Sequence, residues 1–384
     1  MRNKTGILVF LMSLAFVSGS FLSSAKAVDE KAKCTINHWV GFNARPSYIM
    51  PTHGFYNGWN ELGKQLKAGG NLDLQYGFSM SGKSVYQGCG FGIHSFGSHE
   101  LMGTPMSLYI FQGAPLFCLS DRFTVGYEWN FGLSAGWKDN GIVVVSPLNA
   151  YINVAALLTW NINDHWDMIA GPEYTHFSNG DTRFPNGGAN TINLRIGAKR
   201  YFARTEPGVK TERIFIDDAS SLKSDNRISY DLMFFGAWRA DRSIAGGTLH
   251  IINESFPVAG LNFNPLYHFN DYLSAGASLD LIYDGSADLQ VSVDEDGTLH
   301  YVSPDFMSQC ASGLSARAEL KMPIFAVNIG IGYNLLHKGQ DLDCLYGMFA
   351  LKAFVTDMLY LNVGYRLSSV LYSHNLMFGL GIRL

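Results

Sequence analysis

The chain has 384 residues, of which 47% are hydrophobic, 14% aromatic and only 16% charged, and its formal net charge is −4. An ordinary soluble domain carries about 25% charged residues, so this composition is not typical of one. The slightly negative charge, without a clustered basic patch, gives no reason to expect nucleic acid as a partner.

The first 27 residues predict a secretory signal peptide. Arg2 and Lys4 precede an apolar run over residues 6–17, and a tail of small residues ends at Ala27. The run is too short to span a bilayer as a helix, which takes roughly 20 apolar residues, and no later segment provides them. We therefore expect an exported chain that is not anchored by a helix.

Several later segments are typical of β-strands separated by turns. Residues 123–137 and 148–161 are two examples, with turn formers at 139–141 and 164–165. Over residues 359–366, apolar side chains alternate with Tyr, Asn, Gly and Arg, so one face suits lipid and the other a barrel interior. The pattern predicts an all-β fold, a transmembrane antiparallel β-barrel, with a secreted soluble β-sandwich as the alternative.

Charged and small polar residues concentrate over 205–226, between two β-rich blocks. This composition predicts a linker or a long loop. Each block is long enough for eight strands of roughly 10 residues, and residues 166–197 weakly resemble 359–381. We predict two tandem eight-stranded barrels, over 28–204 and 227–384, and a single barrel of about 14 to 16 strands is the alternative.

Cysteine and histidine spacing gives no sign of a metal site. The five cysteines are odd in number and have no C-x-x-C pair. The string Gly132-Leu-Ser-Ala-Gly136 matches a nucleophile elbow, but a turn follows it instead of a helix, so Ser134 is interpreted as a strand residue. We expect neither a metal nor a cofactor. The cysteines are Cys34, Cys89, Cys118, Cys310 and Cys344.

His176 and Ser178 are the main chemical feature of the sequence. They stand two residues apart in a predicted strand, and side chains at i and i+2 of a strand share a face. An imidazole and a hydroxyl placed in this way can serve as base and nucleophile of a hydrolase. Residues 185–188, Pro-Asn-Gly-Gly, allow a tight turn with free backbone N–H groups close by.

Three segments carry a resemblance to a known family: His176-Phe-Ser-Asn-Gly180, Pro185-Asn-Gly-Gly-Ala-Asn190 and the strand end Arg200-Tyr-Phe202. They resemble the outer-membrane lipid A 3-O-deacylases of the PagL type, which are also described as acyloxyacyl-hydrolase-like proteins. The resemblance is densest over 165–202, extends loosely back to about residue 85, and leaves the second block outside it. It implies an eight-stranded barrel in the cell outer membrane that cleaves an ester-linked acyl chain of lipid A, the lipid part of lipopolysaccharide.

The resemblance also implies roles for individual residues. Ser178 becomes the nucleophile and His176 its general base, both on the outer surface of the barrel. Asn186 helps to stabilise the oxyanion, and Asn179 and Gly180 complete the set of oxyanion and substrate contacts.

The chain departs from the family pattern at the third catalytic position. The deacylases place a glutamate on the following strand, where this chain has Asn190. An asparagine can hold an imidazole in one tautomer but stabilises the imidazolium less. Asp181 is a second candidate for this role, whereas Glu173 has the opposite strand parity to His176.

Two classes of function follow from the sequence. The first is an esterase acting on lipid A, and the second is a non-catalytic barrel, either structural or porin-like. An outward-facing His176–Ser178 pair within about 3 Å favours the enzyme, and a pair facing the lumen favours the channel. Whether the protein forms a homodimer is left open.

Overall fold

Two closed β-barrels make up the computed structural model, which describes residues 36–80, 85–204, 227–245, 248–270, 272–294, 298–321, 325–342, 345–368 and 372–384. Eight antiparallel strands close each barrel, which confirms the predicted all-β tandem fold over the single large barrel. The predicted signal peptide (1–27), the predicted linker (205–226), Cys34 and Cys344 lie outside the described residues. Of the described cysteines, Cys89 and Cys310 are free thiols.

The first barrel consists of the first eight strands in sequence order, each hydrogen-bonded to the next, and closes by pairing its last strand with its first. Two short helical turns, η1 (Gly54–Tyr56) and α2 (His99–Met102), lie in the segments between strands. The strands are β1 (Ile36–Ile49), β2 (Ala68–Met80), β3 (Tyr86–Ser95), β4 (Gly103–Cys118), β5 (Phe123–Trp137), β6 (Leu148–Asn163), β7 (Trp166–Ser178) and β8 (Ala189–Ala203).

The second barrel repeats this plan and closes by pairing β18 with β9. A separate two-stranded hairpin, β12 (Gln290–Val293) with β13 (Leu299–Val302), and the turn η3 (Phe306–Gln309) lie between β11 and β14. The barrel strands are β9 (Ile228–Ala245), β10 (Thr248–His268), β11 (Leu273–Asp284), β14 (Cys310–Lys321), β15 (Phe325–His337), β16 (Leu345–Phe354), β17 (Leu359–Ser368) and β18 (Tyr372–Arg383).

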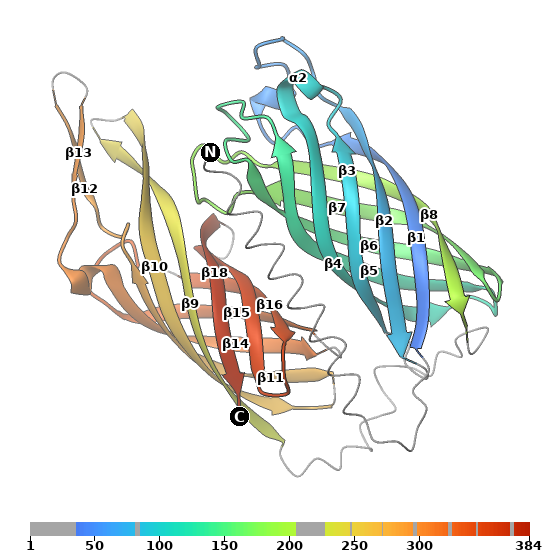
Figure 1. The fold of residues 1–384 in the computed structure, drawn as a ribbon. Helices are drawn as coiled ribbons and strands as arrows, with labels where there is room; N and C mark the ends of the chain where they lie inside the picture. Colours follow the sequence, from blue (N-terminus) through green and yellow to red (C-terminus); the bar gives the residue numbers. More distant parts are fainter. Residues whose placement is uncertain are drawn as a thin grey trace, which may run out of the picture.

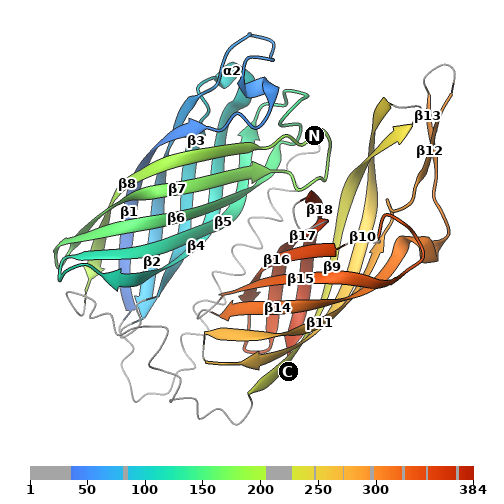
Figure 2. The same cartoon turned by 180° about the vertical axis from the view of Figure 1, so that it is seen from behind.

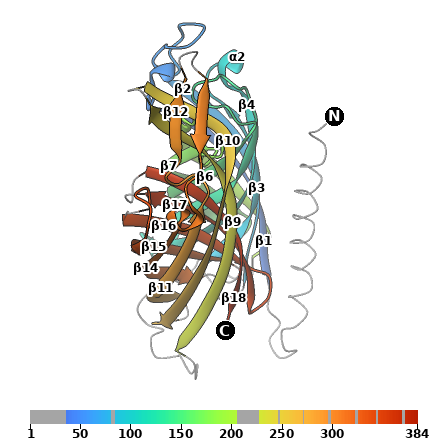
Figure 3. The same cartoon turned by 90° about the vertical axis from the view of Figure 1, so that its left-hand side faces the viewer.

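Long loops gather at one end of each barrel and short turns at the other. In the first barrel, residues 50–67, 138–147 and 179–188 lie at the loop end, and 119–122 and 164–165 at the turn end. The barrels lie side by side with their loop ends toward the same side, as the positions of α2 and of β12–β13 show (Figures 1 and 2). Figure 3 views the pair from the side of the second barrel, with the first barrel behind it. None of the described helices has the length and apolar character needed to cross a membrane.

Side chains alternate between the barrel interior and the outer surface, as the sequence predicts. On β17, Tyr360, Asn362 and Arg366 are buried, whereas Leu361 between the first two is 40% exposed. On β8, Ile192 lies on the outer face and is 49% exposed. Apolar side chains therefore cover the outer surface, the pattern of a barrel whose strands contact lipid.

Ion pairs fill the interior of the first barrel. Arg195 Nη1 lies 2.5 Å from Glu128 Oε1 and Arg195 Nε lies 2.8 Å from Glu173 Oε2. Arg45 Nε lies 2.9 Å from Asp73 Oδ1. All five side chains are buried. A water-filled channel would leave them exposed, so at this level the barrel is packed and not open.

The second barrel has a comparable interior. Lys352 Nζ lies 2.6 Å from both Asp231 Oδ2 and Glu319 Oε2, and Arg383 bridges the same two carboxylates. These four side chains are buried as well. Both interiors thus pair these buried charges with opposite ones, which offsets the cost of removing them from water.

Arg195→Met is expected to lower the free energy of unfolding of the first barrel by about 3 to 5 kcal/mol, because it leaves the buried carboxylates of Glu128 and Glu173 without the partner that they share. The change can be measured in detergent as the urea dependence of the folded, heat-modifiable band on a gel. Arg200→Met is the matched control, since Arg200 lies on the outer face of the same strand and is exposed. Equal stability of the two variants would contradict a stabilising role for the interior pairs.

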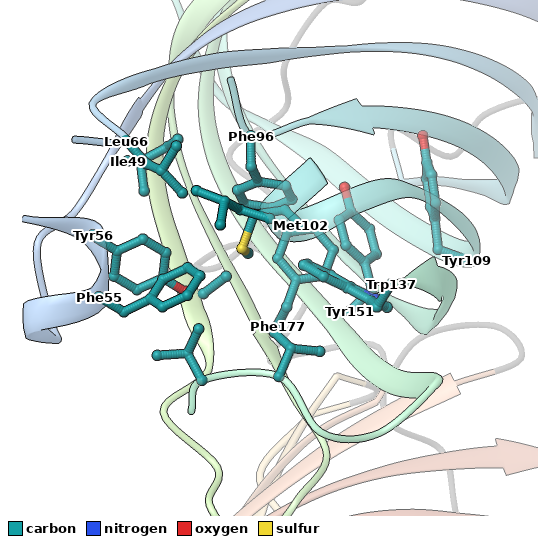
Figure 4. Packing of buried hydrophobic residues seen from close by; sticks show 14 of the residues in the cluster. Ile49, Phe55, Tyr56, Leu66, Phe96, Met102, Tyr109, Trp137, Tyr151 and Phe177 are labelled. Atoms are coloured by element: carbon teal, nitrogen blue, oxygen red, sulfur yellow. The ribbon is translucent and has the colours of Figure 1, made fainter. Parts of the chain in front are cut away.

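An apolar cluster closes the loop end of the first barrel. Phe55 and Tyr56 from the β1–β2 loop pack with Phe96, Met102 and Trp137, residues that lie at or near the loop ends of strands (Figure 4). These residues are buried. The cluster fixes the loops above the barrel and, with them, the end of β7.

Candidate active site

Strand β7 places His176 and Ser178 on the outer surface of the first barrel. Along this strand Asp167, Ile169, Glu173 and other odd-numbered positions are buried, whereas the even-numbered positions are exposed or half-buried. His176 and Ser178 belong to the second set and are half-buried. Glu173 faces the interior, as its parity predicts, where it pairs with arginines.

Phe177, between these two residues, explains why both face outward. Its ring points into the apolar cluster, with centroids 5.0 Å from Trp137, 5.3 Å from Tyr151 and 5.7 Å from Phe96 (Figure 4). Burying a large aromatic ring contributes more to stability than burying an imidazole or a hydroxyl. Because strand side chains alternate, the inward Phe177 directs both neighbours toward the outside.

His176, Ser178 and Asn190 form a hydrogen-bonded row. Ser178 Oγ lies 3.0 Å from His176 Nε2, and His176 Nδ1 lies 2.7 Å from Asn190 Oδ1. His176 and Asn190 are direct cross-strand partners of β7 and β8. With Oδ1 as acceptor, Nδ1 carries the imidazole proton, so Nε2 is free to accept the proton of the serine hydroxyl. Asn190, and not Asp181, thus occupies the third position of the row.

Tyr174 extends the row by one residue that the sequence analysis did not identify. Its hydroxyl donates to Asn190 Oδ1 at 2.6 Å. This bond keeps Asn190 Oδ1, rather than the amide nitrogen, directed at the Tyr174 hydroxyl and at His176 Nδ1. The signal was present in the sequence, because Tyr174 stands two residues before His176 on the same face of the strand.

Residues 179–188 form a loop beside Ser178, which we call the reactive loop. Gly188 approaches the pair closely, since a Cβ atom there would lie 3.8 Å from His176 Cε1 and 2.8 Å from the carbonyl oxygen of Phe177. The Gly188 N–H donates to Val143 O at 3.0 Å, and the Tyr56 hydroxyl donates to Gly188 O at 2.5 Å. The positive φ of 62° at Gly188 is another reason for glycine there.

The predicted oxyanion and substrate residues all lie in the reactive loop, Asn179 and Gly180 at its start and Asn186 near its end. Asn186 Oδ1 accepts the N–H of Asn179 at 3.3 Å, and Asn186 Nδ2 donates to Asp181 Oδ1 at 2.9 Å. Gly180 faces Leu376 of the second barrel. These contacts join Asn179 and Asn186 to each other, and the side-chain amide of Asn186 is directed at Asp181. Their role toward an oxyanion stays a prediction.

A histidine next to a serine is not in itself distinctive in this protein. Within the part of the chain that the structure describes, His94 Nε2 also lies 2.8 Å from Ser107 Oγ, and His268 Nε2 lies 2.8 Å from Ser229 Oγ. Ser107 and Ser229 face the barrel interiors and are buried. Only a pair on the outer surface can reach a lipid, so position and not pairing distinguishes His176 and Ser178.

Tyr174→Phe is expected to lower the rate of any reaction that His176 assists by about tenfold, because it removes the hydrogen bond that orients the Asn190 amide. The ring and its packing remain, so the amount of folded protein should not change. The measurement is the initial rate of ester hydrolysis in detergent micelles. A wild-type rate in the variant would show that Asn190 keeps its orientation without Tyr174.

One family model matches the chain. It is PagL_C, described as "Acyloxyacyl hydrolase, C-terminal domain", and it covers residues 228–384, which is the second barrel. No curated protein matches the chain.

Solved structures that are similar to the chain include Neisserial surface protein A, with 8% identity, a TM-score of 0.28 and coverage of 42% of this chain and 96% of that one. The siderophore receptor PirA from Pseudomonas aeruginosa has 7% identity and a TM-score of 0.24, over 92% of this chain and 81% of the receptor. The toluene transporter TodX from P. putida has 11% identity and a TM-score of 0.19, over 92% and 89%. The fold assignment rests on the strand pairing of this chain itself.

The family match corrects the predicted location of the resemblance. We expected the resemblance in the N-terminal half, with the second block outside it. The family model instead matches the C-terminal half. The prediction relied on a short polar motif around His176 and Ser178. The second barrel has no such motif in the corresponding sequence, so a motif-based comparison does not detect its similarity to the family.

Proposed function

We propose that this protein is an outer-membrane esterase that hydrolyses an ester-linked acyl chain of lipid A, with Ser178 as the nucleophile and His176 as its general base. One observation carries the proposal. The row Tyr174, Asn190, His176 and Ser178 lies on the outer face of the first barrel, with hydrogen-bond distances of 2.6, 2.7 and 3.0 Å. This arrangement activates a hydroxyl that faces lipid.

The chemistry proceeds in two steps that need no metal or cofactor. Ser178 Oγ attacks the ester carbonyl carbon while its proton passes to His176 Nε2, and the tetrahedral intermediate collapses as His176 returns the proton to the departing alcohol oxygen. Water then attacks the acyl-enzyme carbonyl and gives one proton to His176 Nε2. As the second tetrahedral intermediate collapses, the bond from the acyl carbon to Ser178 Oγ breaks, His176 returns the proton to Oγ, and the fatty acid leaves. Throughout, Asn190 Oδ1 accepts a hydrogen bond from His176 Nδ1–H and holds the imidazole in place.

The position of the row along the barrel favours a lipid ester near the outer membrane surface. Ser178 is the last residue of β7, at the loop end, and on the same outer face Met168 is 41% exposed. In barrels of this type the long loops are extracellular and the apolar band contacts acyl chains. The nucleophile then lies at the boundary between headgroups and acyl chains of the outer leaflet, where the esters of lipid A are found.

The family match supports the class of reaction. The matched description names a C-terminal domain of an acyloxyacyl hydrolase, and in this chain the matched segment follows the barrel that carries His176 and Ser178. We infer that the two barrels form one hydrolase, with the chemistry in the first. A porin-like function is disfavoured by the packed, ion-paired interiors of both barrels.

Mass spectrometry of lipid A from cells with and without the protein tests the proposal. Loss of one hydroxyacyl chain identifies an ester on the sugar as the substrate, and loss of one unsubstituted acyl chain identifies an acyloxyacyl ester. Either mass change supports the esterase. Identical lipid A spectra, with the barrel shown to be present in the membrane, would favour the non-catalytic barrel.

A further inference from the structure

The reactive loop contacts the second barrel directly. The backbone N–H of Ala240 on β9 donates to the carbonyl oxygen of Asp181 at 3.0 Å. Gly180 lies against Leu376 of β18, so closely that a Cβ atom at Gly180 would be 2.7 Å from Leu376 Cγ. Strands β9 and β18 are neighbours in the sheet. Ala240 and Leu376 therefore form one patch, which we call the docking patch.

The conformation of the loop fits this contact. Gly180 and Asp181 both have left-handed backbone conformations, with φ values of 67° and 59°. Such a conformation is uncommon for a residue other than glycine, and at Asp181 it directs the carbonyl oxygen to β9. Ala240 is 1% exposed, and Asp181 is 6% exposed. The contact is thus closed to solvent on both sides.

A second contact between the two barrels lies farther from their loop ends. The rings of Trp129 on β5 and Phe325 on β15 pack edge to face with centroids 6.5 Å apart. Trp129 lies on a strand of the first barrel that is separated from β7 by β6 alone. Two contacts at different heights fix the relative position of the barrels better than one, so the docking patch has a defined position against the loop.

Hydrogen bonds lead from the docking patch to the residue after the nucleophile. Ala240 N–H binds Asp181 O, Asp181 Oδ1 accepts from Asn186 Nδ2, and Asn186 Oδ1 accepts from Asn179 N–H. Asn179 follows Ser178 in the chain. The other end of the loop, Gly188, is held by the first barrel's own loops. Between these ends, Arg183 Nη1 donates to Val145 O at 3.2 Å, so the first barrel also holds the middle of the loop. The second barrel holds it at Gly180 and Asp181.

We propose that the second barrel positions the reactive loop, and that Leu376 and Ala240 set the turnover rate of the site without touching the substrate. The inference rests on the proposed function. It assigns a task to a barrel that lacks the His-Ser motif, and it explains why the two barrels are joined in one chain. A displacement of about 1 Å in a site of this kind can reduce a rate about 100-fold.

Leu376→Ala in the full-length protein tests the inference. The variant removes the side chain against which Gly180 packs, so the reactive loop gains freedom while both barrels remain closed. We expect kcat to fall by about 10- to 100-fold with KM changed less than about twofold, because the loop aligns the reacting groups and does not provide most of the lipid contact. Hydrogen–deuterium exchange of residues 179–188 should become faster in the same variant.

Two further variants make the test specific. Leu380→Ala is the matched control, since Leu380 lies on the same strand and is 50% exposed, and it should keep wild-type turnover and exchange. Leu376→Met should also keep wild-type turnover and wild-type exchange, because methionine still fills the space beside Gly180. Wild-type exchange and kcat in Leu376→Ala would overturn the inference. If the wild-type protein hydrolyses no lipid ester, the proposed function fails separately, and the exchange measurement still decides whether the second barrel holds the loop.

Discussion

Ser178→Ala is expected to abolish release of fatty acid from lipopolysaccharide, with a fall in kcat of about 10⁶-fold. Removing the nucleophile of a hydrolase that works through a serine and a histidine has an effect of this order. The side chain is half-buried on the outer face, and its loss removes one hydrogen bond, to His176. Folding into the membrane should be unchanged. The measurement is fatty acid released from purified lipopolysaccharide in mixed micelles.

Ser107→Ala is the matched control for this experiment. Ser107 Oγ also lies 2.8 Å from a histidine nitrogen, but the pair faces the barrel interior and Ser107 is 1% exposed. The control should keep wild-type turnover. Release that persists in Ser178→Ala, or that disappears in Ser107→Ala from a folded barrel, would show that the outer-surface row is not the site of reaction.

Asn190→Leu is expected to lower kcat by about 10⁴-fold, because it removes the acceptor for the Nδ1 proton of His176. Without the Asn190 oxygen, the imidazole can carry its proton on Nε2. In that tautomer Nε2 cannot accept the proton of the Ser178 hydroxyl. Loss of the correct tautomer has an effect of this order in a serine protease triad. Leucine has the same number of side-chain heavy atoms as asparagine and the same branch at Cγ, so the shape of the side chain beside Tyr174 is retained.

Asn190→Glu is the complementary variant. A carboxylate accepts from both His176 Nδ1 and the Tyr174 hydroxyl, and it stabilises the imidazolium that forms in the transition state better than an amide does. Turnover should therefore equal or exceed that of the wild-type protein. A rate for Asn190→Leu within tenfold of the wild-type rate would contradict the assignment of Asn190 as the residue that fixes the His176 tautomer.

The sequence was sufficient to predict the strands and the division of the chain into two β-rich blocks. Residues 123–137 form β5 as predicted, and 148–161 lie within β6, because alternating apolar and small or polar side chains match the two environments of a barrel wall. The choice between two small barrels and one large one could not be made from strand patterns. It depends on which strands pair at closure, and β8 returns to β1.

The geometry of the site was partly predictable. The shared face of His176 and Ser178 follows from their spacing alone, and the structure meets the condition of an outward pair at 3.0 Å. Which face of β7 points outward depends on the packing of Phe177 in the aromatic cluster at the loop end of the barrel. That cluster brings together residues that are far apart in the sequence. The contact of Gly180 with Leu376 was unpredictable for the same reason, since it joins two barrels.

Labelling with a fluorophosphonate tests the central claim most directly, because this reagent forms a covalent bond with a serine only when a neighbouring base has activated it. Mass spectrometry of the labelled protein should find one modified peptide, which contains Ser178, and His176→Ala should lose the label. An unlabelled wild-type barrel, a label on another serine, or equal labelling of wild type and His176→Ala would contradict the account.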